Sequence, residues 1–192
     1  MTQLFLPMRP ILFRAIDTLE GFYAQGLESW NVAGNMDDNR LIHAANVHLE
    51  ILELIESQGF ATSSAIARLL WETAVVKKES SVWFIRNSTP EAAILFMLCS
   101  AARVPLEKLM KADLTEPHFR SLTLNVAQLP QRPLKLCRAP NLGSFKKAIK
   151  AARARYRAKN AFCDWILSPE EILAAQISGL RVIAPAHHPE QG

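Results

Sequence analysis

Short apolar runs alternate with longer helix-like segments along most of this 192-residue chain. The run SVWFI at 81–85, for example, is rich in the β-branched and aromatic residues that strands favour. Strands that alternate with helices predict an α/β fold, in which a mainly parallel sheet carries helices on both of its faces. We expect further strands near 134–138, 160–165 and 180–185.

Another apolar run, LEILELI at 49–55, allows two interpretations. Its glutamates at three-residue spacing favour a helix, whereas a short apolar run that ends at a glycine-containing turn favours a buried strand. We interpret it as a strand of the sheet. We then expect a turn over 57–63 at the carboxyl edge of the sheet, where open α/β sheets bind ligands.

Helix-start signals lie between the expected strands. Thr89 and Pro90 supply an N-cap residue and a proline that suits the first helical position. Ser168 and Glu171 form a capping-box pattern, and Gly179 is placed to end the same helix. The patterns predict helices over 10–25, 64–78, 90–102, 115–129, 144–159 and 168–178.

The first of these helices carries a continuous apolar stripe of Leu12, Ile16, Leu19 and Tyr23. An amphipathic helix must cover such a stripe, either on its own domain or on another chain. We expect residues 1–26 to form an N-terminal helical arm and residues 27–192 to form one domain.

Composition indicates a folded globule rather than a disordered chain, with 49% hydrophobic and 21% charged residues. No apolar run approaches the roughly 18 residues of a membrane span, and the N-terminus is not typical of a signal peptide. The three cysteines are far apart in apolar contexts, which suits reduced core residues of a cytoplasmic protein. Only His187 and His188 have ligand-like spacing, so we expect no metal site.

The net charge of +4 has one local source. Residues 144–159 carry seven of the 22 lysines and arginines and no acidic residue, which leaves 15 basic residues against 18 acidic ones elsewhere. Such a segment can bind nucleic-acid phosphates. It can equally be a solvated outer helix, because its charges spread around much of its circumference. The candidates for nucleic-acid contact are Lys146, Lys147, Lys150, Arg153 and Arg157.

Residues 100–156 read SAARVPLEKLMKADLTEPHFRSLTLNVAQLPQRPLKLCRAPNLGSFKKAIKAARARY. This segment resembles the motor domain of DnaB-type replicative DNA helicases. There, a run like S-E-A-R-V-x-L-x-K-L-R-x-G-x-L-T-x-x-D-W precedes a helix, a short strand P-L-x-I, a turn with a proline and a basic helix. The resemblance implies a RecA-like P-loop NTPase-type fold, which is a three-layer sandwich with a mainly parallel sheet and an N-terminal linker helix.

The resemblance extends over nearly all of the chain. Residues 9–26 are similar to the linker helix of the family, and 160–167 are similar to its Walker B strand, with Asp164 and Trp165 in place of Asp-Tyr. The next strand is followed by His187, which is either a ligand-reading residue at the sheet edge or a solvated tail residue. The scaffold domain of the family, and the later strands that carry its arginine finger and much of its DNA contact, have no counterpart.

The phosphate-binding loop is where this sequence departs from the family. The resemblance places SQGFATSS, with Gly59, on the P-loop, so that Ala61, Thr62 and Ser63 fall on Gly-Lys-[Ser/Thr]. Thr62 is then a neutral hydroxyl in place of a lysine, and Ala61 replaces a glycine that permits φ > 0. Ser63 could still offer its hydroxyl to Mg²⁺. The glutamate that acts on the attacking water in the family is replaced by Asn87 or a neighbour.

These departures lead us to expect a non-catalytic pseudo-ATPase, because phosphoryl transfer depends on placed charges. Asp164 is the one acidic survivor, either as a Mg²⁺ ligand or as a strand-end residue that caps a neighbouring loop. The expected role is that of an adaptor or modulator in DNA replication or recombination. Self-association, or binding to a RecA-like helicase partner, is expected through the N-terminal helix.

Two alternatives remain open. The first is a weak nucleotide-binding or ATP-hydrolysing protein with a non-standard loop, and only this alternative calls for ATP and Mg²⁺ as cofactors. The second is a nucleic-acid-binding module that uses the basic helix at 144–159.

Overall fold

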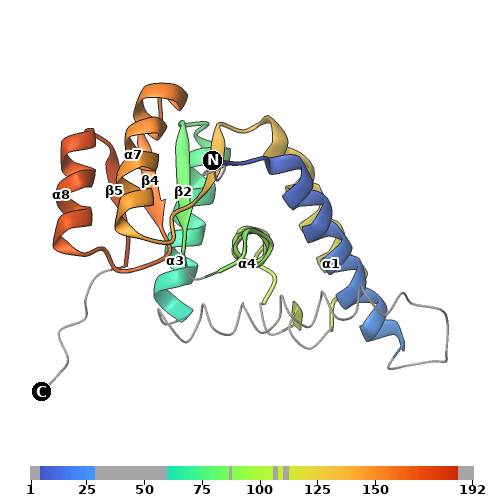
Figure 1. The fold of residues 1–192 in the computed structure, drawn as a ribbon. Coiled ribbons are helices and arrows are strands. Elements are labelled where there is room, and N and C mark those ends of the chain that lie inside the picture. Colours follow the sequence, from blue (N-terminus) through green and yellow to red (C-terminus); the bar gives the residue numbers. More distant parts are fainter. Residues whose placement is uncertain (1–4, 29–59, 87, 106–107, 110–112, 186–192) are drawn as a thin grey trace, which may run out of the picture.

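Five strands form one sheet in the part of the chain that the computed structural model describes. This part comprises residues 5–28, 60–86, 88–105, 108–109 and 113–185, with the backbone alone described for 21–28 and 60–64. The strands lie in the spatial order β1-β3-β2-β4-β5 (Figure 1). Their bounds are Phe5–Leu6 (β1), Ser81–Ile85 (β2), Leu134–Arg138 (β3), Asn160–Cys163 (β4) and Arg181–Ile183 (β5).

The sheet is mixed but mostly parallel. Trp83 of β2 pairs in parallel with Leu136 of β3 on one side and with Phe162 of β4 on the other. β5 pairs in parallel with β4, whereas β1 pairs antiparallel with β3 at the opposite edge. The prediction of an α/β fold with a mainly parallel sheet is therefore confirmed.

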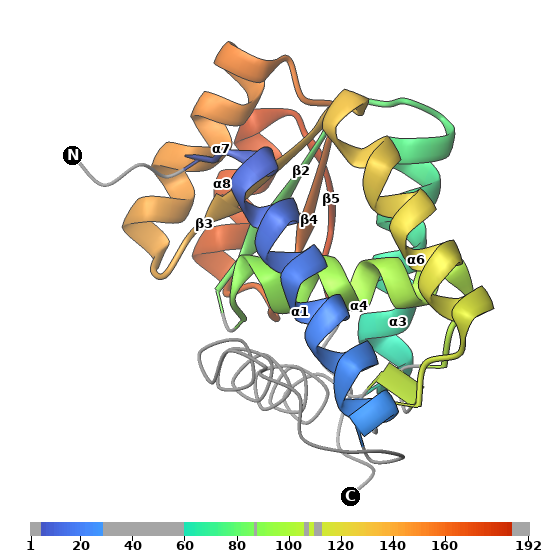
Figure 2. The same ribbon diagram turned by 90° about the vertical axis from the view of Figure 1, so that its right-hand side faces the viewer.

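The helices lie in two layers, one on each face of the sheet (Figures 1 and 2). Four of them, α1, α3, α4 and α6, cover one face, and α7 and α8 cover the other. Their bounds are Met8–Glu28 (α1), Phe60–Trp71 (α3), Pro90–Ala102 (α4), Glu116–Gln128 (α6), Leu142–Tyr156 (α7) and Pro169–Ser178 (α8).

The alternation of side chains along β2 creates two separate cores, because successive residues of a strand point to opposite faces. Trp83 and Ile85 pack in the core beneath α1, α3, α4 and α6. Val82 and Phe84 pack in the core beneath α7 and α8. The four consecutive apolar residues of this strand, 82–85, thus follow from burial on both faces.

Helix α1 packs on its own domain. It continues to Glu28, past Gly21 and Gly26, and its buried residues share one core with α4 and α6. Its Arg14 forms an ion pair with Glu91 in the first turn of α4. The segment predicted as an arm is therefore joined to the rest by a common core, which includes Ile11, Leu12, Ala15 and Leu19.

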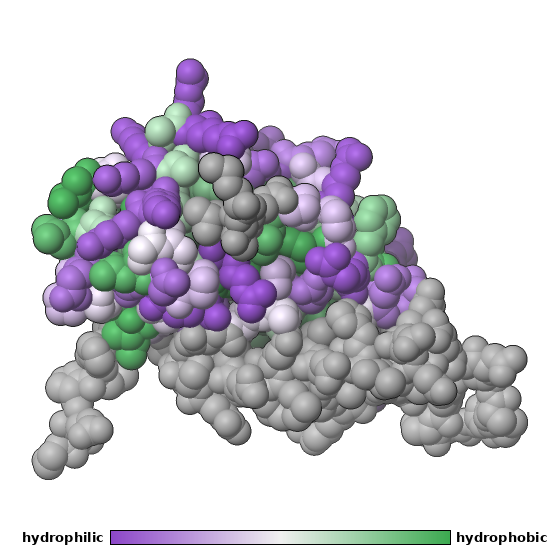
Figure 3. Space-filling model, viewed as in Figure 1, coloured by the Kyte–Doolittle hydropathy of each residue, from purple (hydrophilic) through white to green (hydrophobic). Residues whose placement is uncertain are grey.

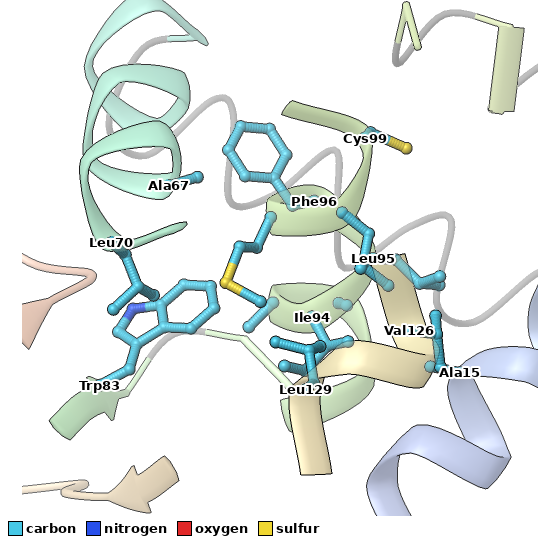
Figure 4. Close-up of a cluster of buried hydrophobic side chains, with 14 of the residues drawn as sticks. Ala15, Ala67, Leu70, Trp83, Ile94, Leu95, Phe96, Cys99, Val126 and Leu129 are labelled. Carbon is cyan, nitrogen blue, oxygen red and sulfur yellow. The ribbon is translucent and has the colours of Figure 1, made fainter. Parts of the chain in front are cut away.

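Helix α4 lies at the centre of this layer. Figure 1 views it end-on and Figure 2 views it from the side, so it runs across the sheet rather than along the strands. All residues from 91 to 99 are buried, and a helix that is apolar on all sides has to be enclosed by other elements. Figure 4 shows Phe96 on the side of Ala67 in α3, and Leu95 on the side of Val126 and Ala15.

Helix α3 begins earlier than the sequence pattern indicates. Residues 60–63 are helical, so the turn predicted over 57–63 is wrong for that part, and a π-helix at Glu72–Val76 ends the segment. Ala61 offers the physical reason, because alanine favours a helix over glycine by about 1 kcal/mol. The strand expected at 49–55 lies outside the described residues.

The three cysteines are buried and unpaired with one another. Burial raises the pKa of the Cys99 and Cys137 thiols to about 12, and it raises that of Cys163 well above its ordinary value. These thiols are therefore protonated core residues at neutral pH. Within the described ranges, no helix combines the length and the apolar character needed to cross a bilayer.

We expect Trp83→Phe to change the free energy of unfolding by less than about 1 kcal/mol, although Trp83 is fully buried. Its indole Nε1 finds no hydrogen-bond acceptor among the described residues. Removing an unpaired N–H removes a desolvation penalty of roughly 1–3 kcal/mol. This gain offsets the hydrophobic stabilisation that is lost because phenylalanine buries less apolar area than tryptophan.

Urea unfolding followed by circular dichroism measures this change. Trp83→Ala serves as the comparison, since a cavity of that size costs about 3–5 kcal/mol. A loss above about 2 kcal/mol in Trp83→Phe would show that the indole N–H is hydrogen-bonded in solution.

Candidate functional site

The direction of the chain through the sheet reverses between β2 and β4. From β2 the chain moves to β3 on one side through α4 and α6, and it then returns through α7 to β4 on the other side. In open α/β sheets, ligands bind outside the carboxyl ends of the strands at such a switch point. Arg86 and Ser88 follow β2 there, and Asp164 and Trp165 follow β4, which makes this edge the candidate functional site.

Asp164 links the ends of the two strands. One carboxylate oxygen accepts the backbone N–H of Arg86 at 2.9 Å, and the other accepts the hydroxyl of Ser88 at 3.1 Å. The Asp164 backbone N–H donates to the carbonyl of Phe84 at 3.2 Å, which continues the ladder between β2 and β4. Asp164 is only 3% exposed, and its carboxylate therefore holds the loop that leads into α4.

Arg86 extends across the edge of the sheet from β2 toward α8. Its Nε donates to the carbonyl of Ala139 after β3 at 2.9 Å, and its Nη2 pairs with the carboxylate of Glu171. Its guanidinium carbon lies 3.9 Å from the centroid of the Trp165 ring, which is a cation–π contact. One arginine thus connects the carboxyl ends of three strands to α8.

Glu171 accepts from three donors, although it is only 2% exposed. Arg86 contacts one carboxylate oxygen, and the other accepts the Trp165 Nε1–H and the Ser168 backbone N–H, each at 3.0 Å. Burial alone would raise the pKa of Glu171, but the hydrogen bonds from these three donors outweigh burial and hold the pKa below its ordinary value. Glu171 is thus an ionised anchor for the arginine.

The chemistry that this edge offers is limited by these pairings. The carboxylates of Asp164 and Glu171 and the guanidinium of Arg86 all bond to neighbouring groups of the same network. No cluster of three or more metal-ligating side chains occurs in the described part of the chain. The arrangement therefore fixes the ends of strands and helices, as a satisfied buried polar network does.

An apolar hollow of about 440 Å³ lies beside the network, between α8 and the end of β5. Figure 3 shows hydrophobic surface at the left margin of the molecule, over α8, where Leu173 and Ile177 are exposed. The hollow has one polar side chain, that of Gln176, and no ionisable one, so it is unsuited to a phosphate ligand. It is lined by Ile166, Leu167, Ile172, Ala175, Gln176, Leu180, Val182, Ala184 and Pro185.

The structure does not bring the predicted site residues together in one place. Asp164 lies in the network at the sheet edge, whereas Ala61, Thr62 and Ser63 lie in the first turn of α3, where the backbone alone is described. Gly59, Asn87 and His187 lie outside the described residues. The basic candidates Lys146, Lys147, Lys150, Arg153 and Arg157 are exposed along and just after α7, on the outer surface.

Sequence reasoning missed Arg86 and Glu171 as partners. Two local signals pointed to them separately: a basic residue directly after the apolar run 82–85, and the acidic third residue of a capping box. Nothing local joins them, because 85 positions separate them in the chain.

The comparisons with known proteins identify no relative of this chain. No protein-family model matches the chain, and neither a curated protein nor a solved structure matches it. The described residues define an α/β protein in which five of the strands form one mixed, mostly parallel sheet.

Proposed function

We propose that the chain is a non-catalytic relative of the motor domain of DnaB-type replicative helicases, which acts as an adaptor or modulator in DNA replication or recombination. The observation that carries this proposal is the pairing of Asp164. The resemblance puts this residue where the family has its Walker B aspartate. Here its two oxygens accept from Arg86 and Ser88, which favours the role of a loop cap over that of a Mg²⁺ ligand.

The position after β2 supports the same proposal. In the family this loop supplies the glutamate that acts on the attacking water. Here the loop begins with Arg86, whose positive charge bonds to Glu171 across the edge. A cation held in this way cannot accept a proton, and the step that would need a base has none among the described residues of the loop.

The crossovers of the sheet are compatible with a RecA-like arrangement. Connections that move toward β5 carry their helix on the α7 and α8 face, whereas the connection from β2 back to β3 carries α4 and α6 on the other face. α3 lies on that second face and leads into β2.

A partner contact through α1 is the remaining part of the proposal. The stripe that the resemblance assigns to a neighbouring subunit contains Leu12 and Leu19, which are buried within this chain. A contact through α1 therefore uses its outer face, where Phe13 is 67% exposed.

Calorimetric titration with ATP and Mg²⁺ tests the proposal against the alternative of an ATPase with a non-standard loop. We expect no binding at micromolar concentrations, because Thr62 brings no charge to the phosphates. Ala61→Gly combined with Thr62→Lys should raise the affinity for phosphate if this segment retains P-loop geometry.

Ala65→Lys is the matched control, since it adds one lysine to an exposed position of the same helix. Equal gains in both variants would indicate a general charge effect rather than a phosphate-binding loop. Micromolar ATP affinity in the unmodified protein would contradict the non-catalytic assignment and favour the ATPase.

A further inference from the structure

The outer face of α7 carries a row of positive charges. Its apolar residues Phe145, Ala148, Ile149 and Ala152 are buried against the sheet. On the opposite side, Lys146, Lys150, Arg153 and Arg157 follow each other at intervals of four, three and four residues, and all are exposed. Residues at these intervals share one side of a helix, so the four charges form a row about 16 Å long.

This row is not balanced within its own helix. α7 contains no acidic residue in its first turn, and none occurs from 144 to 159. Like charges three and four positions apart disfavour a helix, because the side chains are neighbours on its surface. Lys146 contributes to the lowered pKa of Glu170, whose main causes are hydrogen bonds to its own backbone and to Ser168. The remaining three members of the row have no acidic partner at salt-bridge distance among the described residues.

The carboxyl-terminal end of α7 gathers more positive charge. Lys135 of β3 lies 5.7 Å from the centroid of the Tyr156 ring, and the Arg155 guanidinium lies 5.8 Å from it. Arg155 is two positions from Arg153 and two from Arg157, so it lies on another side of α7, and these two cations are not part of the row. Figure 3 shows hydrophilic residues over α7 on this face of the molecule.

Arg157 occupies a backbone conformation that favours glycine. It ends α7 with φ 51° and ψ 35°, which is the left-handed region. The same position at the end of α8 holds Gly179, with φ 68°. An arginine there is less stable than a glycine would be, because its Cβ is strained in this region. Arg157 thus adds a positive charge at the end of the row, although a glycine at this position would be more stable.

We propose that the outer face of α7, formed by Lys146, Lys150, Arg153 and Arg157, binds the phosphate backbone of nucleic acid without reading its sequence. Arg and Lys at this spacing neutralise phosphates, and the resulting release of counterions drives the binding. Contacts of such charges to phosphates carry no sequence information directly, so we expect duplexes of different sequence to bind alike. This surface is separate from the sheet edge that contains Asp164, and the inference does not depend on the proposed function.

A lipid surface is the competing polyanion. An interfacial helix inserts an apolar face beside its charges, whereas the apolar residues of α7 are buried in the core. The geometry therefore favours a polymer of phosphates over a membrane.

Fluorescence anisotropy with a labelled DNA duplex, measured from about 50 to 200 mM salt, tests the proposal. Four phosphate contacts predict a slope of log affinity against log salt of about −3.6, and hence a loss of about a hundredfold over this range. Lys150→Gln with Arg153→Gln should reduce the slope by about two. Arg9→Gln with Arg120→Gln removes the same charge from exposed positions on α1 and α6, and it should leave the slope close to that of the wild type.

A second pair of variants separates charge from folding. Arg157→Gly should raise the melting temperature, because glycine removes the backbone strain at this position. It should still reduce the salt slope by about one, because one cation is lost. Arg103→Gly is the matched control, since Arg103 ends α4 with φ 55°, away from α7. It should raise the melting temperature and leave DNA binding unchanged.

Three results would overturn the proposal. One is an equal salt slope in the α7 variant and in its α1 and α6 control. Another is that the α7 variants bind DNA more weakly only to the extent that their folded fraction, measured by circular dichroism, is lower. The third is binding to vesicles that contain phosphatidylserine without binding to the duplex, which would assign the face to a lipid surface.

Discussion

Phe96→Ala is expected to lower the free energy of unfolding by about 3–5 kcal/mol, which is a large share of the stability of a domain of this size. Phe96 lies at the middle of α4, is 2% exposed, and faces α3 in the core that also contains Trp83. Its removal leaves a cavity among rigid neighbours on α3 and the sheet, which cannot close around an alanine. Urea unfolding followed by circular dichroism would measure the loss.

Phe13→Ala is the matched control, because it deletes the same side chain from the exposed face of α1. It should leave the urea midpoint within about 0.5 kcal/mol of the wild type. Similar losses in both variants would mean that α4 is not enclosed as described. A larger loss for Phe13→Ala would mean that the outer face of α1 is covered in solution, as an interaction through α1 requires.

Glu171→Ala should destabilise the fold by about 3 kcal/mol at neutral pH, since it leaves the buried side of Arg86 without its counter-charge. It also removes the acceptor of the Trp165 indole N–H and of the Ser168 N–H. The double variant Arg86→Met with Glu171→Leu should lose less than Glu171→Ala alone, because no unpaired charge remains. Glu170→Ala, which removes the exposed neighbouring acid, should leave the urea midpoint close to that of the wild type.

The contribution of Glu171 should depend on pH in a defined direction. Its pKa is lower in the folded chain than in the unfolded chain, where a glutamate titrates near about 4.3. The stability that it contributes is therefore present above that value and is lost as the pH falls through the folded pKa. The difference between wild type and Glu171→Ala should be constant from about pH 7 to pH 5 and shrink below about pH 4. A difference that persists unchanged in acid would show that the loss comes from packing and not from charge.

Short-range sequence signals were sufficient to predict β2 and the start of α4. The strand at 81–85 was predicted with its observed bounds, because a short run with four consecutive apolar residues is typical of a strand that is buried on both faces. The start of α4 was predicted as well. The hydroxyl of Thr89 accepts the Ala92 N–H at 3.3 Å, and Pro90 occupies the first helical position.

The features that escaped prediction depend on distant parts of the chain. Gly26 was expected to end α1, but the helix continues to Glu28, so the weak helix preference of a single glycine does not end it. The turn predicted over 57–63 followed from the placement of a P-loop, whereas its residues 60–63 form the first turn of α3. The network of Arg86 and Glu171 joins two helix and strand ends that only the tertiary fold brings together.

The central position of α4 also constrains how the chain can mature during synthesis. Two of its covers, α1 and α3, precede it in the chain, but α6 follows it and begins only at Glu116. Among the described elements, α6 is therefore the last cover of this largely apolar helix to be synthesised, roughly one to five seconds after α4 at ordinary elongation rates. During this interval, the flank of α4 that α6 will cover is accessible to chaperones and to other nascent chains.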